Sequence, residues 1–172
     1  MKDTSVMARL PGLLFVGLAL GGCVDTAPRP QPAFYASLAS PGARIDAVSA
    51  RNLINAYRRN LGLPPVEVDA GLQVFAERQA DTLAAADRID ATRATPLQKR
   101  LATSGIGASR ALENVSAGYH SFSDAFSGWR GSPNHDATLR LAGASRMGIA
   151  TAYNSQSKYK VYWVLVVTEP SR

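Results

Sequence analysis

Cysteine and histidine are scarce in this chain, which has one cysteine and two histidines in 172 residues. A single cysteine cannot form an internal disulfide, so packing alone must hold the folded chain together. The sequence also lacks a nucleophile elbow (G-x-S-x-G), an H-E-x-x-H zinc motif and a P-loop. No standard catalytic signature therefore points to an enzyme.

The apolar run over residues 10–20 is too short to form a permanent transmembrane helix, which needs roughly 20 residues. Basic residues precede it, and Gly21-Gly22-Cys23 follows it. This order is typical of a bacterial lipoprotein signal. We expect residues 1–22 to be cleaved and Cys23 to be lipidated. The alternative is an ordinary cleaved signal with an incidental cysteine.

Lipidation at Cys23 would place the protein in the bacterial cell envelope, on the periplasmic side and attached to a membrane. More than one acyl chain gives stable anchoring, whereas a single chain is marginal. The next residue, Val24, is not the aspartate associated with retention at the inner membrane, which leaves the outer membrane open as a destination. On this interpretation the only thiol belongs to the export signal, which excludes a cysteine hydrolase.

Residues 23–44 differ in composition from the rest of the chain. Four prolines and a glycine stand there among small residues, namely Pro28, Pro30, Pro32, Pro41 and Gly42. Such a composition resists regular structure, so we expect a flexible tether after the lipidated cysteine. The globular domain is then expected over residues 45–170.

Positive charge is modest and scattered, with a formal net charge of +6. No run of basic residues is interleaved with aromatic side chains, so we expect no nucleic-acid partner. A general attraction to anionic lipids or cell-wall polymers is the milder inference. We expect no cofactor, and we expect a monomer.

Four segments combine apolar residues at helical spacing with capping residues. They run from about Asp46 to Leu61, from Asp69 past Leu83, from Thr95 to about Ser104, and from Ser121 to Gly131. Ser132-Pro133 is expected to open another helix, with Ser132 as its N-cap rather than as a nucleophile.

The C-terminal part changes to a strand pattern, with one strand over residues 147–153 and another over residues 159–168. The second strand is apolar at nearly every position, so both of its faces should be covered. We therefore predict an α+β fold, a three-layer α/β/α sandwich around a small and mostly antiparallel sheet.

Three blocks of sequence belong together: Glu113 to Tyr119 (ENVSAGY), Gly128 to His135 (GWRGSPNH) and Arg146 to Ala150 (RMGIA). Their order and spacing resemble the bacterial branch of the CAP superfamily, the SCP-domain family of cysteine-rich secretory proteins, antigen 5 and plant pathogenesis-related proteins. The resemblance covers roughly residues 46–168. It implies an α-β-α sandwich, in agreement with the fold expected from periodicity.

The resemblance also implies a cleft that gathers histidines and acidic residues. The matching positions are Glu113 and His135, and we expect Asn114 and Tyr119 to line the same cleft. Where the family usually has a first histidine, this chain has Ala91. Because a catalytic zinc normally has three protein ligands, we expect no metal site unless His120 or Asp90 contributes a ligand; His120 itself is expected to be an exposed loop residue.

Three functions remain open. The favoured one is a non-enzymatic module whose cleft binds a lipid, glycan or peptide of the envelope. The second is a hydrolase in which Glu113 acts as a base assisted by His135. The third is a structural envelope protein in which Glu113 and His135 pair to support the fold.

Overall fold

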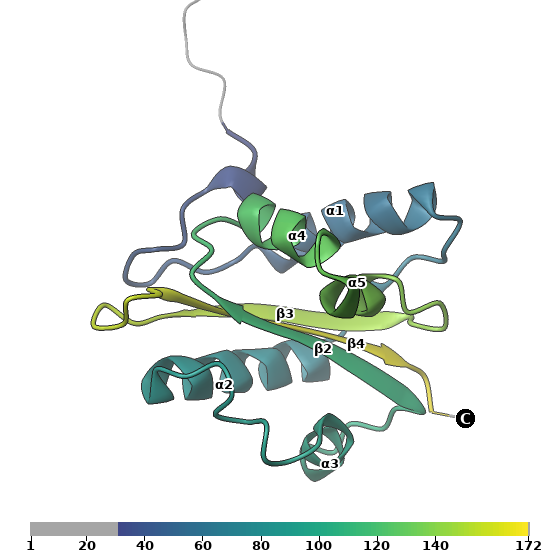
Figure 1. The fold of residues 1–172 in the computed structure, drawn as a ribbon. Helices are drawn as coiled ribbons and strands as arrows, with labels where there is room; N and C mark the ends of the chain where they lie inside the picture. The colour runs from purple at the N-terminus through teal and green to yellow at the C-terminus, as the bar shows by residue number, and fades with distance from the viewer. Residues whose placement is uncertain (1–30, 172) are drawn as a thin grey trace, which may run out of the picture. The chain divides into compact units, whose positions relative to one another are not determined.

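The computed structural model describes residues 31–171; the expected signal peptide, Cys23 and the beginning of the expected tether lie outside the described residues. A four-stranded sheet lies between two layers of helices (Figure 1). One layer holds α1 (Ala47–Asn60), α4 (Phe122–Arg130) and α5 (Pro133–Leu139), and the other holds α2 (Ala70–Ala86) and α3 (Leu97–Thr103). The predicted α/β/α sandwich is confirmed.

The sheet has the strand order β1-β3-β4-β2. Its strands are β1 (Glu67–Val68), β2 (Arg110–Ala117), β3 (Arg146–Tyr153) and β4 (Val161–Glu169). Antiparallel pairing joins β3 to β4 and β4 to β2, and only the short β1 runs parallel to its neighbour β3. Strand β4 is buried over nearly its whole length, as its apolar run predicts. Strand β2 forms an edge of the sheet.

The predicted N-cap of α2 is confirmed, since Asp69 Oδ1 accepts from the N–H of Leu72 (2.9 Å). Side chains also cap α1 and α4, and of these the sequence predicted the cap at Ser121. Asp46 accepts hydrogen bonds from the backbone N–H groups of Val48 (3.0 Å) and Ser49 (3.2 Å) at the start of α1. Ser121 Oγ accepts from the N–H of Asp124 (3.2 Å) at the start of α4. Each bond satisfies a donor that the first turn of a helix leaves free.

The predicted cap of α3 is wrong. The helix begins at Leu97 with Pro96 at the N-cap position, and no side chain caps it. The Thr95 carbonyl instead accepts a hydrogen bond from Arg100 Nε (3.0 Å). The segment therefore serves to position Arg100 rather than to cap the helix.

The sheet separates two hydrophobic clusters. Above it, Trp129 and Trp163 pack edge to face with ring centroids 6.0 Å apart, and Phe122 contacts both rings. Below it, α2 packs Leu72 and Leu83 against the lower face of β4. These two clusters set the positions of the helices relative to the edge strand β2.

Part of the expected tether differs from the prediction. Residues 33–35 form a short 3-10 helix, η1 (Ala33–Tyr35), which lies beside α4 (Figure 1). Leu38 is only 7% exposed, and its N–H donates to the carbonyl of His120 (2.7 Å). The packed part of the chain therefore begins before residue 45, because Leu38 supplies an apolar side chain to the upper cluster.

Within residues 31–171, no helix combines the length and the hydrophobicity needed to span a membrane.

Candidate functional site

A hollow of about 390 Å³ lies along β2. Glu113 and Val115 of this strand form one wall. The loop after α2 adds four residues, Ile89, Asp90, Thr92 and Arg93, and the start of α5 adds Asn134 and His135. The loop and the helix can both reach β2 because it is an edge strand. Glu113 and His135, which the sequence blocks predicted to share a cleft, line the same hollow.

Glu113 is held by Arg100 of α3. The Arg100 guanidinium donates from Nη2 to Glu113 Oε1, and its Nη1 donates to Gln79 Oε1 (2.8 Å). The same guanidinium lies 5.8 Å from the centre of the Phe75 ring. Only 10% of the Arg100 side chain and 23% of the Glu113 side chain are exposed. Glu113 Oε2 is buried and has no hydrogen-bond partner among the described residues.

His135 contributes a neutral imidazole to the hollow. Burial lowers the pKa of this histidine below its ordinary value of 6.5. A neutral imidazole offers one hydrogen-bond donor and one acceptor. Neither a hydrogen bond nor an ion pair joins the His135 side chain to Glu113 in the described structure. A supporting pair between them, one of the alternatives considered from the sequence, is therefore not formed.

Asn114 fixes the start of α5 and does not line the hollow. Its side chain is fully buried, and its Nδ2 donates to the backbone carbonyl of His135 (3.0 Å). Successive residues of a strand point to opposite faces, so Asn114 and Glu113 lie on different sides of the sheet. Asn114 is thus a residue that positions His135.

Tyr119 also lies away from the hollow, contrary to the expectation. Its hydroxyl occupies the space beside Gly128 of α4, where a Cβ atom would lie 2.1 Å from it. Its carbonyl accepts a hydrogen bond from Trp163 Nε1 (2.8 Å). This tyrosine packs at the end of β2 into the upper layer, since the chain turns at Gly118 with a φ of +95°.

The residues around the hollow do not fit a metal site. Among residues 31–171, no three His, Cys, Asp or Glu side chains are grouped closely enough to hold a metal ion. Glu113 is bound to Arg100, and Asp90 is bound to Arg88 (2.9 Å). His120 is exposed and does not line the hollow. With Ala91 partly buried against α2, His135 is the single histidine at the site.

Ser132 stands at the N-cap position of α5, but its hydroxyl makes no capping bond. Its backbone carbonyl accepts from the N–H of Asp136 (2.8 Å). Nothing in this arrangement resembles an activated nucleophile, which requires an adjacent base.

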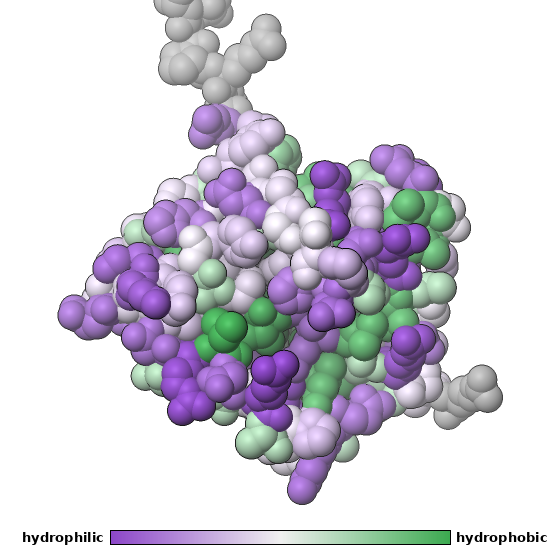
Figure 2. All heavy atoms as spheres, in the orientation of Figure 1, coloured by the Kyte–Doolittle hydropathy of each residue, from purple (hydrophilic) through white to green (hydrophobic). Residues whose placement is uncertain are grey.

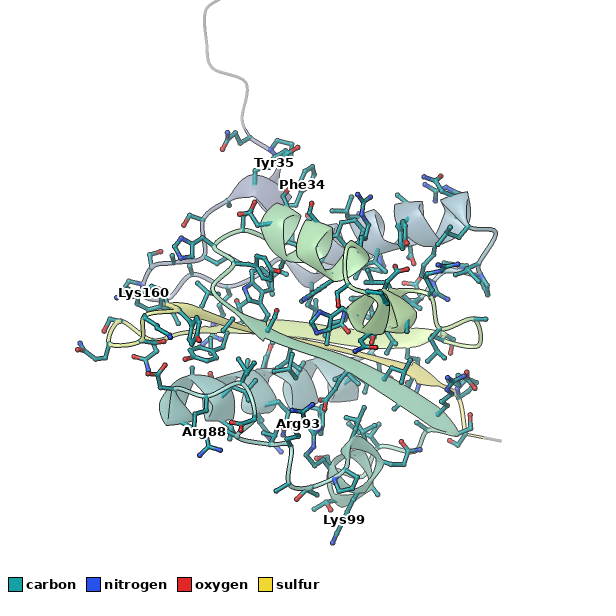
Figure 3. The ribbon with its side chains drawn as sticks, viewed as in Figure 1. Phe34, Tyr35, Arg88, Arg93, Lys99 and Lys160 are labelled. Carbon is teal, nitrogen blue, oxygen red and sulfur yellow. The ribbon has the colours of Figure 1, made fainter. Side chains whose placement is uncertain are left out.

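Arg100 is the residue that sequence reasoning missed. In the sequence it belongs to a loose group of basic residues with Arg88, Arg93 and Lys99. Figure 3 labels the other three members of this group. The Arg100 partners Gln79 and Glu113 lie 21 and 13 positions away. No local pattern reveals such a long-range ion pair. The carboxylates of the hollow, Glu113 and Asp90, are each paired with an arginine. The other polar groups are a neutral imidazole, an amide, a hydroxyl and the Arg93 side chain.

Residues 51–167 match the family described as the cysteine-rich secretory protein family, CAP. A comparison with curated protein sequences found no match. Two thirds of the chain or more superposes on several solved bacterial structures. An outer surface protein from Borrelia burgdorferi has a TM-score of 0.65 and 18% identity, over 74% of this chain and 98% of that one.

Two longer proteins share the fold. An extracellular SCP-domain protein from Bacillus anthracis has a TM-score of 0.61 and 19% identity, over 72% of this chain and 40% of that one. A cysteine-rich secretory protein from Staphylococcus aureus has a TM-score of 0.57 and 19% identity, over 72% and 38%. This chain thus spans about two fifths of each of these proteins. At such identities the likeness establishes the fold alone.

Proposed function

Because this chain belongs to the CAP family, we propose that it is an extracytoplasmic, lipid-anchored binding protein whose β2 hollow takes a glycan of the bacterial cell envelope. The observation that carries the proposal is the state of Glu113, whose charge is compensated by Arg100 within the site. Fold alone does not assign a function, whereas the groups that line the hollow determine which ligand it can take.

The lining of the hollow suits a sugar. Sugars present many hydroxyl groups, which donate and accept hydrogen bonds, and apolar ring faces between them. His135, Asn134 and Thr92 supply donors and acceptors, while Ile89 and Val115 supply apolar surface. The volume of about 390 Å³ falls within the range of about 300–1,000 Å³ that is usual for small-molecule sites. A long acyl chain would leave these polar groups without partners, which is costly.

Binding is favoured over catalysis for two reasons. A general base must have a free oxygen within reach of the substrate proton, whereas Arg100 occupies Glu113 Oε1 and Glu113 Oε2 is buried. A histidine assisting this base would have to contact it, and no such contact joins His135 to Glu113. His135 is therefore assigned to ligand recognition, and Glu113, held by Arg100, to the wall of the hollow.

Anchoring rests on the sequence, because Cys23 lies outside the described residues. The two longer structural neighbours are an extracellular and a secretory protein, and the third is an outer surface protein. An extracytoplasmic location for this chain is consistent with all three. A tethered domain of this kind would hold its cleft near envelope polymers.

The test measures binding of three probes to the full chain in detergent: soluble cell-wall glycan fragments, cell-wall stem peptides and short-chain phospholipid. Glu113→Gln removes the carboxylate charge while keeping the shape of the side chain. Glu67→Gln is the matched control, because Glu67 also pairs with an arginine, Arg51 at 2.8 Å, but lies outside the hollow. Thermal unfolding of each variant separates loss of binding from loss of folding.

The glycan fragments are expected to bind the wild type and the Glu67→Gln variant, and to bind Glu113→Gln about tenfold more weakly. A neutral amide weakens the bond to Arg100 that holds this wall of the hollow, and hydrogen bonds to charged groups contribute about 1.5–3 kcal/mol. Binding of the peptides or the phospholipid alone would overturn the glycan assignment. Turnover of the glycan that Glu113→Gln abolishes would establish the hydrolase instead.

A further inference from the structure

We call the hollow along β2, for which a glycan ligand is proposed, the glycan cleft. A second hollow, of about 600 Å³, lies on the other side of α5 from it. Three arginines from three different elements line it: Arg110 at the start of β2, Arg130 at the end of α4, and Arg140 just after α5. We call this hollow the arginine groove. The face of the molecule that carries α4, α5 and β2 has strongly hydrophilic side chains beside exposed hydrophobic surface (Figure 2).

The arginine groove holds more positive charge than its own acid can neutralise. Asp136 is the only acidic residue in the lining. Its Oδ1 accepts a hydrogen bond from the Tyr57 hydroxyl (2.7 Å), and its Oδ2 accepts from Arg140 Nη1 (3.3 Å). Asp136 therefore compensates one arginine. Arg110 and Arg130 have no ion-pair or hydrogen-bond partner among residues 31–171, which leaves the groove with a formal charge of +2.

Arg130 is oriented by aromatic rings. Its guanidinium carbon lies 5.3 Å from the centre of the Phe126 ring and 5.6 Å from that of the Tyr57 ring. Cation-π contacts of this kind hold a guanidinium without using its N–H groups. The donors of Arg130 consequently stay available in a side chain whose position is already restrained, which lowers the entropy cost of binding an anion.

We propose that the arginine groove binds a phosphate group carried by an organic ligand. A guanidinium binds phosphate through two parallel N–H donors, and a phosphate monoester carries a charge of about −1.5 to −2 near neutral pH, which matches the charge of the groove. Leu112, Pro133 and Ala137 also line the groove and offer apolar contact to the organic part of the ligand. The phosphate can come from a lipid headgroup or from a soluble phosphate ester.

This site is separate from the glycan cleft and does not depend on the proposed function. The cleft is lined by Asn134 and His135 of α5, whereas the arginine groove is lined by Pro133, Asp136 and Ala137. Variants of one site therefore leave the other intact, and failure of either proposal can be recognised by itself.

The experiment titrates the full chain in detergent with glycerol phosphate and, separately, with short-chain phosphatidic acid, a lipid that carries the same phosphate monoester. Arg130→Gln and Arg110→Gln each remove one uncompensated charge from the groove. Arg59→Gln is the matched control, because Arg59 is exposed on α1 and makes no ion pair within the described residues. The melting temperature of each variant is measured as a check on folding.

At least one of the two probes is expected to bind the wild type, and each groove variant to bind it about tenfold more weakly, which corresponds to about 1.4 kcal/mol. The Arg59→Gln variant is expected to bind like the wild type. Tighter binding of phosphatidic acid identifies a lipid headgroup as the source, and equal or tighter binding of glycerol phosphate identifies a soluble ester. Absence of binding of both probes, or an equal loss in Arg59→Gln, would overturn the proposal.

Discussion

Arg58 is a fully buried cation that holds together the part of the molecule on which α5 rests. Its guanidinium and Nε donate to four backbone carbonyls: Pro64 at 2.8 Å, Leu139 at 2.9 Å, Leu141 at 3.1 Å and Ala144 at 3.4 Å. No carboxylate pairs with it among residues 31–171. Burial accordingly lowers its pKa. We predict that Arg58→Met is strongly destabilising.

The magnitude follows from the carbonyls that lose their donor. A buried polar group without a partner costs about 1–3 kcal/mol, so three short bonds correspond to about 3–9 kcal/mol. Methionine fills part of the space and removes the cost of burying a charge, so the lower end applies. A loss of about 3 kcal/mol is a large fraction of the 5–15 kcal/mol that stabilises a typical domain.

The assay is thermal and urea unfolding of Arg58→Met beside Arg59→Met, in which the neighbouring exposed arginine is changed in the same way. For a domain of this size, about 3 kcal/mol lowers the melting temperature by about 10 °C, while Arg59→Met is expected to stay within about 0.5 kcal/mol of the wild type. Equal unfolding free energies for the two variants would refute the assignment of Arg58 as the buried support of this region.

Three further predictions concern other parts of the molecule. Gly148→Ala is expected to cost at least about 1–3 kcal/mol of unfolding free energy, because the new Cβ would lie 2.2 Å from the Leu72 carbonyl oxygen. Gly131→Ala is the control, since its Cβ meets only ordinary contacts at 3.5 Å. Equal melting temperatures of these two variants would contradict this prediction. The folded state protonates His135 at a lower pH than the unfolded chain does, so this residue does not affect stability well above pH 6.5 and destabilises as pH falls below that value. His135→Gln should remove that part of the pH dependence, measured by unfolding between mildly acidic and neutral pH, and an unchanged profile would count against the buried imidazole. Cys23→Ser should release the protein from the membrane fraction of cells, and persistence there would contradict the lipid anchor.

Much of the fold could be predicted because its signals are local. The apolar run of β4 predicts a covered central strand, and the apolar stripes with their capping residues predict α1, α2 and α4. The short β1 could not be predicted, since two residues become a strand only through pairing with β3. Strand β2 was also missed, because it places polar residues on both faces: Asn114 toward α5, and Glu113 toward α3.

Within the candidate site, the sequence blocks predicted Glu113 and His135 but not the groups that set their chemistry. Arg58 and Arg100 read as members of scattered basic groups, yet both are largely buried, and their acceptors are mostly distant in sequence. Only the fold shows that one arginine supports α5 and the other compensates Glu113. The place of Tyr119 in the first sequence block predicts that it lines the cleft, whereas packing against Gly128 directs its side chain elsewhere.

The most direct test of the glycan cleft uses the two histidines of the chain, one of which lines the hollow while the other lies outside it. The proton NMR signals of both imidazoles are recorded in the full chain, without a histidine tag, as soluble cell-wall glycan fragments are added. We expect saturable shifts of the His135 signals and no change in those of His120. Equal shifts of both histidines, or no shift of His135 at any fragment concentration, would contradict a glycan-binding cleft at β2.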